Sequence, residues 1–219
     1  MVASHDTGSE QLLLWSNPGE GKVLGLSWNP DSDDFRFAIH INLSSKNRGI
    51  RLKPDLTTEE IPSIIQLVVT RRTVLGVVNT CYDPMGLLVP ISIQMKLLLR
   101  DLFCKELNLG WDSPLPDSIK EEWITMFQRL KEVEILTFDR TVQPEGAIGK
   151  PWLILFWDAS DEAMCVTVYI LWHTSSGPIS TLLCAKSRVT PLNRITTPRA
   201  EMQAATMSVR LRKYISKQG

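Results

Sequence analysis

The chain has 219 residues, of which 43% are apolar and 22% charged, so it is long enough to bury one sizeable core or two small ones. Lys and Arg together number 24, as do Asp and Glu, and this balance excludes the strong overall positive charge of many nucleic-acid binders. No apolar run is long enough to span a bilayer, and residues 1–10 lack the features of a secretory signal. We therefore expect an intracellular protein of the cytoplasm or nucleus, not secreted, with no membrane partner.

The four cysteines are far apart in the sequence and lie within apolar runs. This spacing favours buried, reduced thiols over disulfides or a zinc site. The four are Cys81, Cys104, Cys165 and Cys184.

Residues 1–20 are mostly polar and predict a flexible terminus. Asp6, Thr7 and Gly8 spell the tripeptide of aspartic proteases, but polar residues surround them where such an enzyme has a buried apolar strand. After residue 22 the pattern becomes that of strands, and residues 23–28 and 35–41 predict a β-hairpin joined by a polar turn.

Residues 70–136 predict three helices, which together form a helical subdomain. Thr70 is the expected N-cap of a short helix that ends before the turn containing Pro84 and Gly86. A second helix is expected from Pro90 to about residue 107. The third begins at the capping box formed by residues 118–121.

Residues 143–151 read as a linker, and three short apolar runs follow it at residues 152–157, 164–172 and 179–187. Their hairpin-like spacing predicts a mostly antiparallel sheet, and Thr197 with Pro198 predicts the start of a helix. The predicted class is therefore α+β, with a β-hairpin and a helical subdomain followed by three strands and one helix.

Six short motifs occur in a fixed order along the chain. They are TRRTVL at 70–75, YDPMGLL at 82–88, LGWD at 109–112, WDAS at 157–160, AKSRV at 185–189 and TPRAEMQ at 197–203. This order resembles the pol polyprotein of Pao/BEL-type long-terminal-repeat retrotransposons, in the region between the reverse transcriptase palm and ribonuclease H. The resemblance implies a reverse transcriptase thumb or connection-like region over residues 21–142, and a truncated ribonuclease H-like domain over residues 151–219.

The resemblance also implies the chemistry. Ribonuclease H cleaves the RNA strand of an RNA–DNA hybrid with two Mg²⁺ ions, which need about four converging carboxylates. Asp158, at the end of the first strand, matches the first carboxylate of the family, and Glu201, in the first turn of the helix, matches the second. Without the resemblance, Asp158 reads as the start of a turn and Glu201 as a partner of the helix dipole.

This chain ends before the strand and helix that would supply the third and fourth carboxylates. We therefore expect Mg²⁺ in the intact family enzyme, weak or no metal binding here, and no nuclease activity by this chain alone. Asp161 and Glu162 are weaker candidate ligands in the turn after the first strand. Trp157 stands where family members commonly carry a small residue, and we expect its indole to crowd the metal face.

Four basic residues gather between the third strand and the helix: Lys186, Arg188, Arg194 and Arg199. The resemblance implies that they contact phosphates of an RNA–DNA hybrid, while a solvated loop face is the alternative interpretation. The remaining segments of the pol polyprotein are a second expected partner.

Two other functions stay open. The chain fits a non-catalytic interaction or nucleic-acid-binding remnant of a transposable element, decayed or domesticated. The same family region is also called a Pao retrotransposon peptidase, which suggests an aspartic-type peptidase. Against that alternative, Asp158 is followed by Ala159 and Ser160 without the glycine of an aspartic protease turn.

Overall fold

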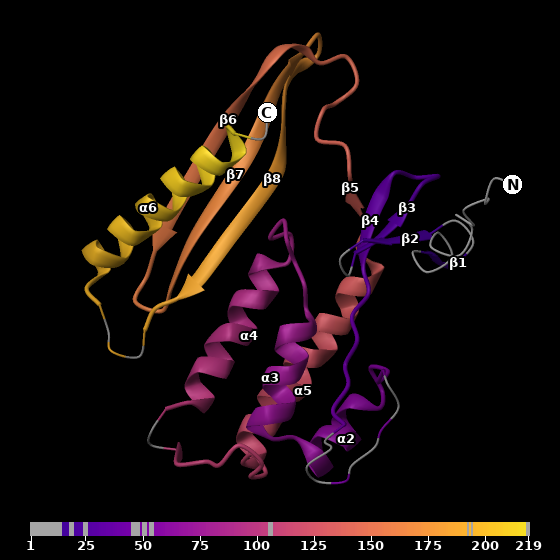
Figure 1. Cartoon of the computed structure of the whole chain (residues 1–219), viewed down its shortest axis with the longest axis vertical. Helices are drawn as coiled ribbons and strands as arrows, with labels where there is room; N and C mark the ends of the chain where they lie inside the picture. The colour runs from indigo at the N-terminus through magenta and orange to yellow at the C-terminus, as the bar shows by residue number, and fades with distance from the viewer. Residues whose placement is uncertain are drawn as a thin grey trace, which may run out of the picture.

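The computed structural model describes residues 15–17, 20–23, 26–44, 49, 52, 55–104, 107–191, 193 and 195–217. A small N-terminal sheet stands beside a group of helices, and a larger sheet with one helix across its face follows them (Figure 1). The α+β class predicted from the sequence is confirmed. No helix in these ranges combines the length and the apolar character needed to cross a bilayer.

The N-terminal sheet contains five short antiparallel strands in chain order. They are β1 (Trp15–Asn17), β2 (Glu20–Val23), β3 (Leu26–Asn29), β4 (Asp34–Phe37) and β5 (Phe138–Asp139). The predicted hairpin is present as β3 and β4, although β1 also forms within the terminus that we predicted to be flexible. Residues 1–14, which include Asp6, Thr7 and Gly8, lie outside the described residues.

Strand β4 ends before the buried residues Ile39 and Ile41, which the alternating pattern had placed in the hairpin. The backbone N–H groups of these two residues donate to side-chain carboxylates and not to a neighbouring strand. The N–H of Ile39 donates to Glu134 and the N–H of Ile41 donates to Asp55, each at 3.0 Å. Ile39 and Ile41 are therefore buried although the strand pairing of β4 has ended before them.

The described residues in the middle of the chain include four α-helices: α2 (Ile61–Val68), α3 (Arg71–Thr80), α4 (Val89–Leu102) and α5 (Asp117–Glu132). The last is continued by the 3-10 turn η3 (Val133–Ile135). They enclose a large core around Trp123 and Phe127, both fully buried. Three of these helices were predicted. Helix α2 was missed, although its buried residues Ile61, Ile65 and Val68 follow helical spacing.

The predicted caps have mixed outcomes. Thr70 caps α3 as expected. Its hydroxyl accepts the backbone N–H of Thr73 at 3.3 Å, and the Thr73 hydroxyl accepts the backbone N–H of Thr70 at 2.9 Å. The capping box predicted at residues 118–121 is wrong. Helix α5 begins after Pro116 without a side-chain cap, and Lys120 pairs with Asp117 in its first turn at 2.9 Å.

The motif at residues 70–75 packs against the motif at residues 109–112. Arg72 donates two hydrogen bonds to the Asp112 carboxylate, at 2.8 and 3.0 Å, and lies over the ring of Trp111. Arg71 donates to the carbonyl of Leu109. These contacts fix the start of α3 to the loop between α4 and α5.

The C-terminal sheet consists of three long antiparallel strands, β6 (Ile148–Ala159), β7 (Ala163–Thr174) and β8 (Gly177–Val189), in the order β6-β7-β8. Strand β6 begins earlier than predicted and takes up Pro151 from the expected linker. In the described part of the chain β6 pairs only with β7, and its ladder is irregular between Ile148 and Trp152. A proline is tolerated there because an edge strand has backbone positions that donate to no neighbour.

Helix α6 (Thr197–Ile215) lies across one face of this sheet (Figure 1). Its buried residues Ala200, Ala204 and Leu211 follow helical spacing, and Leu211 packs on Val166 and Val168 of β7. This second core is small, and Trp152 and Phe156 of β6 remain 66% and 60% exposed. Most of the buried apolar surface therefore belongs to the helical region.

The loop before α4 joins the two parts. The Asp83 carboxylate accepts the N–H groups of Gly86, Leu87 and residue 88 at 2.8, 3.0 and 2.7 Å, which fixes the loop. The N–H of Ala185 in β8 then donates to the carbonyl of Met85 at 2.7 Å. Gly86 has a φ of 77°, and a Cβ on it would lie 2.0 Å from the carbonyl oxygen of Ala185.

A second set of hydrogen bonds joins the turn between β3 and β4 to the residues that follow β5. Asp33, in the turn between β3 and β4, accepts hydrogen bonds from Trp28 at 3.0 Å, from Arg140 at 2.5 and 2.8 Å, and from Thr141 at 3.1 Å. The bond from Arg140 is the main cause that lowers the pKa of Asp33 to about 2. Asp33 also has a φ of 53°, a backbone conformation that Asp tolerates.

Gly86→Ala should destabilise the protein by about 2 kcal/mol or more, since it combines a positive φ with a steric clash against β8. The measurement is the free energy of unfolding from urea denaturation. Gly76→Ala is the matched control, because Gly76 lies in α3 with open space around its Cβ position, and it should stabilise the protein by about 0.5 to 1 kcal/mol. Equal stabilities of the two variants would contradict the close approach.

Asp33→Asn should lower stability at pH 7 and remove a pH-dependent contribution. Because the folded pKa of about 2 lies below the unfolded value of about 3.9, the contribution is present above about pH 4 and is lost as the pH falls through about 2. Urea denaturation from pH 7 to pH 2 measures this. Asp31→Asn, at an exposed position of the same turn, should keep the wild-type profile.

Candidate functional site

The ends of β6 and β8 and the start of α6 lie at the same end of the C-terminal sheet (Figure 1). In the ladder Asp158 pairs with Cys165, and Cys165 pairs with Ser187 of β8. Two strand spacings therefore separate Asp158 from Ser187, or roughly 10 Å between backbones. The first predicted carboxylate and the predicted basic residues of β8 are thus at the same level of the sheet.

Hydrogen bonds hold the turn between β6 and β7 to the two neighbouring elements. The Asp161 carbonyl accepts the hydroxyl of Thr190 at 2.6 Å, after the end of β8, and the Asp161 carboxylate accepts the hydroxyl of Thr197 at 2.7 Å, at the start of α6. Glu162 lies 3.7 Å from Arg100 of α4. Asp161 and Glu162, the alternative metal ligands, therefore have structural partners.

Asp158 is exposed, and its Oδ1 accepts the N–H of Ala159 at 2.8 Å. The preceding residue, Trp157, lines a groove together with Val209 and Arg212 of α6, so its indole faces that helix. Because neighbouring residues of a strand point to opposite faces, Asp158 points away from α6. We expected Trp157 to crowd the metal face, but its indole lies on the other face from Asp158.

Glu201 is exposed and is the fifth residue of α6, so it lies in the second turn of the helix and not in the first. Asp158 thus points away from the helix that carries Glu201. Among the described residues, no group of three or more His, Cys, Asp or Glu side chains is arranged to hold a metal ion. The donor set shown here does not fit the two-metal centre that the resemblance implies.

The predicted basic residues divide into two groups. Lys186 and Arg188 are exposed side chains near the end of β8, and Arg199 is exposed in the first turn of α6. Arg194 lies outside the described residues. Three exposed basic side chains therefore lie at the end of the sheet that also carries the exposed carboxylates Asp158 and Asp161.

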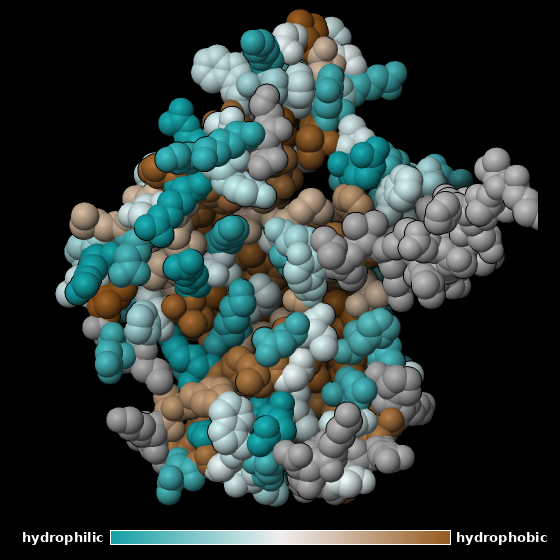
Figure 2. Space-filling view, viewed as in Figure 1, coloured by the Kyte–Doolittle hydropathy of each residue, from teal (hydrophilic) through white to brown (hydrophobic). Residues whose placement is uncertain are grey.

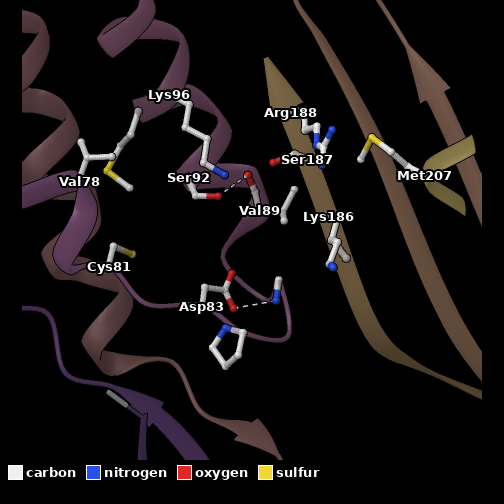
Figure 3. Close-up of a pocket in the computed structure, with 14 residues that line it drawn as sticks. Val78, Cys81, Asp83, Val89, Ser92, Lys96, Lys186, Ser187, Arg188 and Met207 are labelled. Carbon is white, nitrogen blue, oxygen red and sulfur yellow. Dashed lines mark hydrogen bonds between the residues drawn. The ribbon is translucent and has the colours of Figure 1, made fainter. Parts of the chain in front are cut away.

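The tertiary structure adds a cation that sequence reasoning missed. Lys96 of α4 lines a cavity of about 210 Å³ together with Lys186 and Arg188. Ser92 and Ser187 also line it, and Figure 3 shows Lys96 and Ser92 on α4 facing β8 across the cavity. Lys96 and Lys186 are far apart in the chain, and no local pattern indicates that they meet.

Arg210 is a second basic residue that we did not predict. It lines a hollow next to Arg188, between β8 and α6. Hydrophilic side chains gather over α6 in Figure 2. Arg210, Arg212 and Lys213 lie close together in the sequence, and this cluster of basic residues could have predicted a basic surface on the helix.

All four cysteines are free, and each is half-buried. This agrees with the prediction of reduced thiols, although none of the four is fully buried. Cys81 lines the cavity beside Lys96, and burial raises the pKa of its thiol to about 11. A pKa raised in this way favours the neutral thiol, which is the less nucleophilic form.

Comparison with protein families gives a match to the Pao retrotransposon-like RNaseH-like domain over residues 70–219. A search of curated proteins finds no matching relative. The matched region begins at the cap of α3 and runs through α6, so it contains the helices, the junction and the C-terminal sheet. It covers well over half of the chain, and the chain therefore belongs to the family of Pao retrotransposon-like RNaseH-like domains.

Proposed function

We propose that this chain is part of a BEL-type retrotransposon pol polyprotein and that it binds the sugar–phosphate backbone of an RNA–DNA hybrid. In this proposal residues 21–142 correspond to the connection region of a reverse transcriptase, and residues 151–219 to the first part of ribonuclease H. The observation that carries the proposal is the location of Lys186 and Arg188, at the same level of the sheet as Asp158.

Charge supports contact with a nucleic-acid backbone. Lys186, Arg188 and Arg199 are exposed, and within the described residues none of them forms an ion pair. Unpaired Lys and Arg side chains attract phosphates irrespective of base sequence, and binding releases counterions. Since the chain has no net charge, this attraction is local to one end of the sheet.

We further propose that this chain binds Mg²⁺ weakly or not at all and does not cleave a hybrid by itself. In an intact ribonuclease H the metal activates water and stabilises the leaving oxygen. Here Asp158 and Glu201 are the two matched carboxylates, and strand alternation turns Asp158 away from the helix that carries Glu201.

Remaining segments of the pol polyprotein are the second proposed partner. Trp152 and Phe156 are more than half exposed on β6, which pairs with one strand in the described part of the chain. An apolar edge strand of this kind favours contact with a further polypeptide segment.

Hybrid binding should be measured by fluorescence anisotropy with a labelled RNA–DNA hybrid between 50 and 200 mM salt, a range over which phosphate contacts weaken strongly. We expect the double variant Lys186→Gln, Arg188→Gln to bind more weakly and to lower the salt slope by about 2, one for each lost phosphate contact. Lys150→Gln is the matched control, because Lys150 is exposed near the opposite end of β6. An equal loss of affinity in the control would contradict a local site.

Hybrid cleavage with Mg²⁺ tests the catalytic part of the proposal. Wild-type protein and Asp158→Asn should both leave the RNA strand uncut, because the described residues provide no carboxylate cluster. Cleavage that the Asp158→Asn variant abolishes would refute the inactive-chain proposal. Cleavage of a peptide that an aspartic-protease inhibitor blocks would favour the peptidase alternative.

A further inference from the structure

The cavity between α4 and β8 contains groups that suit a phosphate. Three of its lining side chains are cationic: Lys96 on α4, with Lys186 and Arg188 on β8. No ion pair engages any of these three within the described part of the chain. Three cations around a cavity of about 210 Å³ repel one another unless an anion or solvent lies between them.

The one acidic residue that lines the cavity, Asp83, does not serve as their partner. Both of its carboxylate oxygens accept backbone N–H groups, from Gly86 and Leu87 at Oδ1 and from residue 88 at Oδ2. Asp83 therefore holds the loop in place, and the charge on the cavity wall is positive on balance.

A buried hydroxyl supplies an independent observation. The Oγ of Ser187 is buried and has no hydrogen-bond partner among the described residues, which is unfavourable for a polar group. Ser187 belongs to β8, and Figure 3 shows its oxygen on the side of α4, between Lys186 and Arg188 along the strand. Ser92, across the cavity, makes only a long contact of 3.4 Å with the carbonyl of Val89.

We propose that this cavity binds a single phosphate group, held by Lys96, Lys186 and Arg188 and by the hydroxyls of Ser92 and Ser187. A phosphate has enough acceptor oxygens to satisfy several donors at once, whereas a carboxylate has two. A cavity of 150 Å³ accommodates benzene, so about 210 Å³ accommodates a phosphate with bound water. The phosphate would bridge the helical region and the C-terminal sheet.

The source of the phosphate is a nucleic-acid strand, and this choice rests on the proposed function. Two forms share the chemistry: a phosphodiester within a strand, and a terminal or free phosphate monoester. Since the cavity lies at the edge strand β8, beside the exposed Lys186 and Arg188, it is accessible to either form.

The test measures binding of inorganic phosphate to the full chain by isothermal titration calorimetry, with chloride at equal ionic strength as the reference. Lys96→Gln should weaken phosphate binding by about tenfold, because a charge-assisted hydrogen bond is lost. Lys150→Gln, on β6 and outside the cavity, should bind phosphate as the wild type does. Equal phosphate affinity of Lys96→Gln and wild type would overturn the proposal.

Ser187→Ala separates binding from folding. Removing a buried hydroxyl that has no partner should leave the stability of the phosphate-free protein unchanged or higher. The same variant should show a smaller rise in melting temperature when phosphate is added, because the rise follows the affinity for the ligand. A full phosphate-induced rise in Ser187→Ala would count against the site.

Short single-stranded oligonucleotides with and without a 5′-phosphate identify the source by competition with inorganic phosphate. Equal competition identifies the phosphodiester, and competition by the phosphorylated strand alone identifies the monoester. Phosphate binding that depends on Lys96 in a chain that fails to bind the hybrid would refute the proposed function and keep this inference. If the wild type binds the hybrid but Lys96→Gln keeps the phosphate affinity of the wild type, the proposed function is kept and this inference is refuted.

Discussion

The close approach of the loop before α4 to strand β8 is the contact on which the rest of the structure depends. Gly86 lies so near the carbonyl of Ala185 that a side chain has no room, and the Ala185 N–H bonds to the carbonyl of Met85. Asp83 keeps the loop in this shape by accepting three backbone N–H groups. This junction and the pair between Arg100 of α4 and Glu162 join the helical core to the C-terminal sheet.

Several of the motifs that indicate the family make tertiary contacts. The arginines at residues 71 and 72 bind the loop at residues 109–112, and the loop at residues 82–88 docks on residues 185–189. Thr197 at the start of α6 donates to Asp161 in the turn after β6. Four of the six motifs therefore form two pairs whose members contact each other although they are far apart in the chain.

The site has a different relation to the fold. Strand alternation, a local property of β6, places Trp157 and Asp158 on opposite faces of the sheet. The unequal cores add a second constraint, because α6 covers the sheet through small residues such as Ala200 and Ala204 and leaves β6 largely exposed. The end of the sheet thus combines exposed carboxylates at Asp158, Asp161 and Glu162 with exposed basic residues on β8 and a half-covered apolar strand.

The sequence by itself determined the α+β class, three of the four middle helices, the Thr70 cap, the three antiparallel strands and the family. These follow from apolar periodicity, turn residues and motif order, which are all local along the chain. It did not reveal α2, although the buried residues of that helix follow helical spacing. The end of β4 was also hidden, because the carboxylates that bind the next backbone groups come from residues 55 and 134.

Only the tertiary structure decided which charged groups meet. Lys96 lines the same cavity as Lys186 and Arg188, and Gly86 lets the loop before α4 approach β8. The structure likewise turned Asp158 away from the helix of Glu201, although sequence order alone suggested that they converge. Charge clusters of this kind depend on contacts between residues about ninety positions apart, and a pattern with a period of two or 3.6 residues carries no information about such contacts.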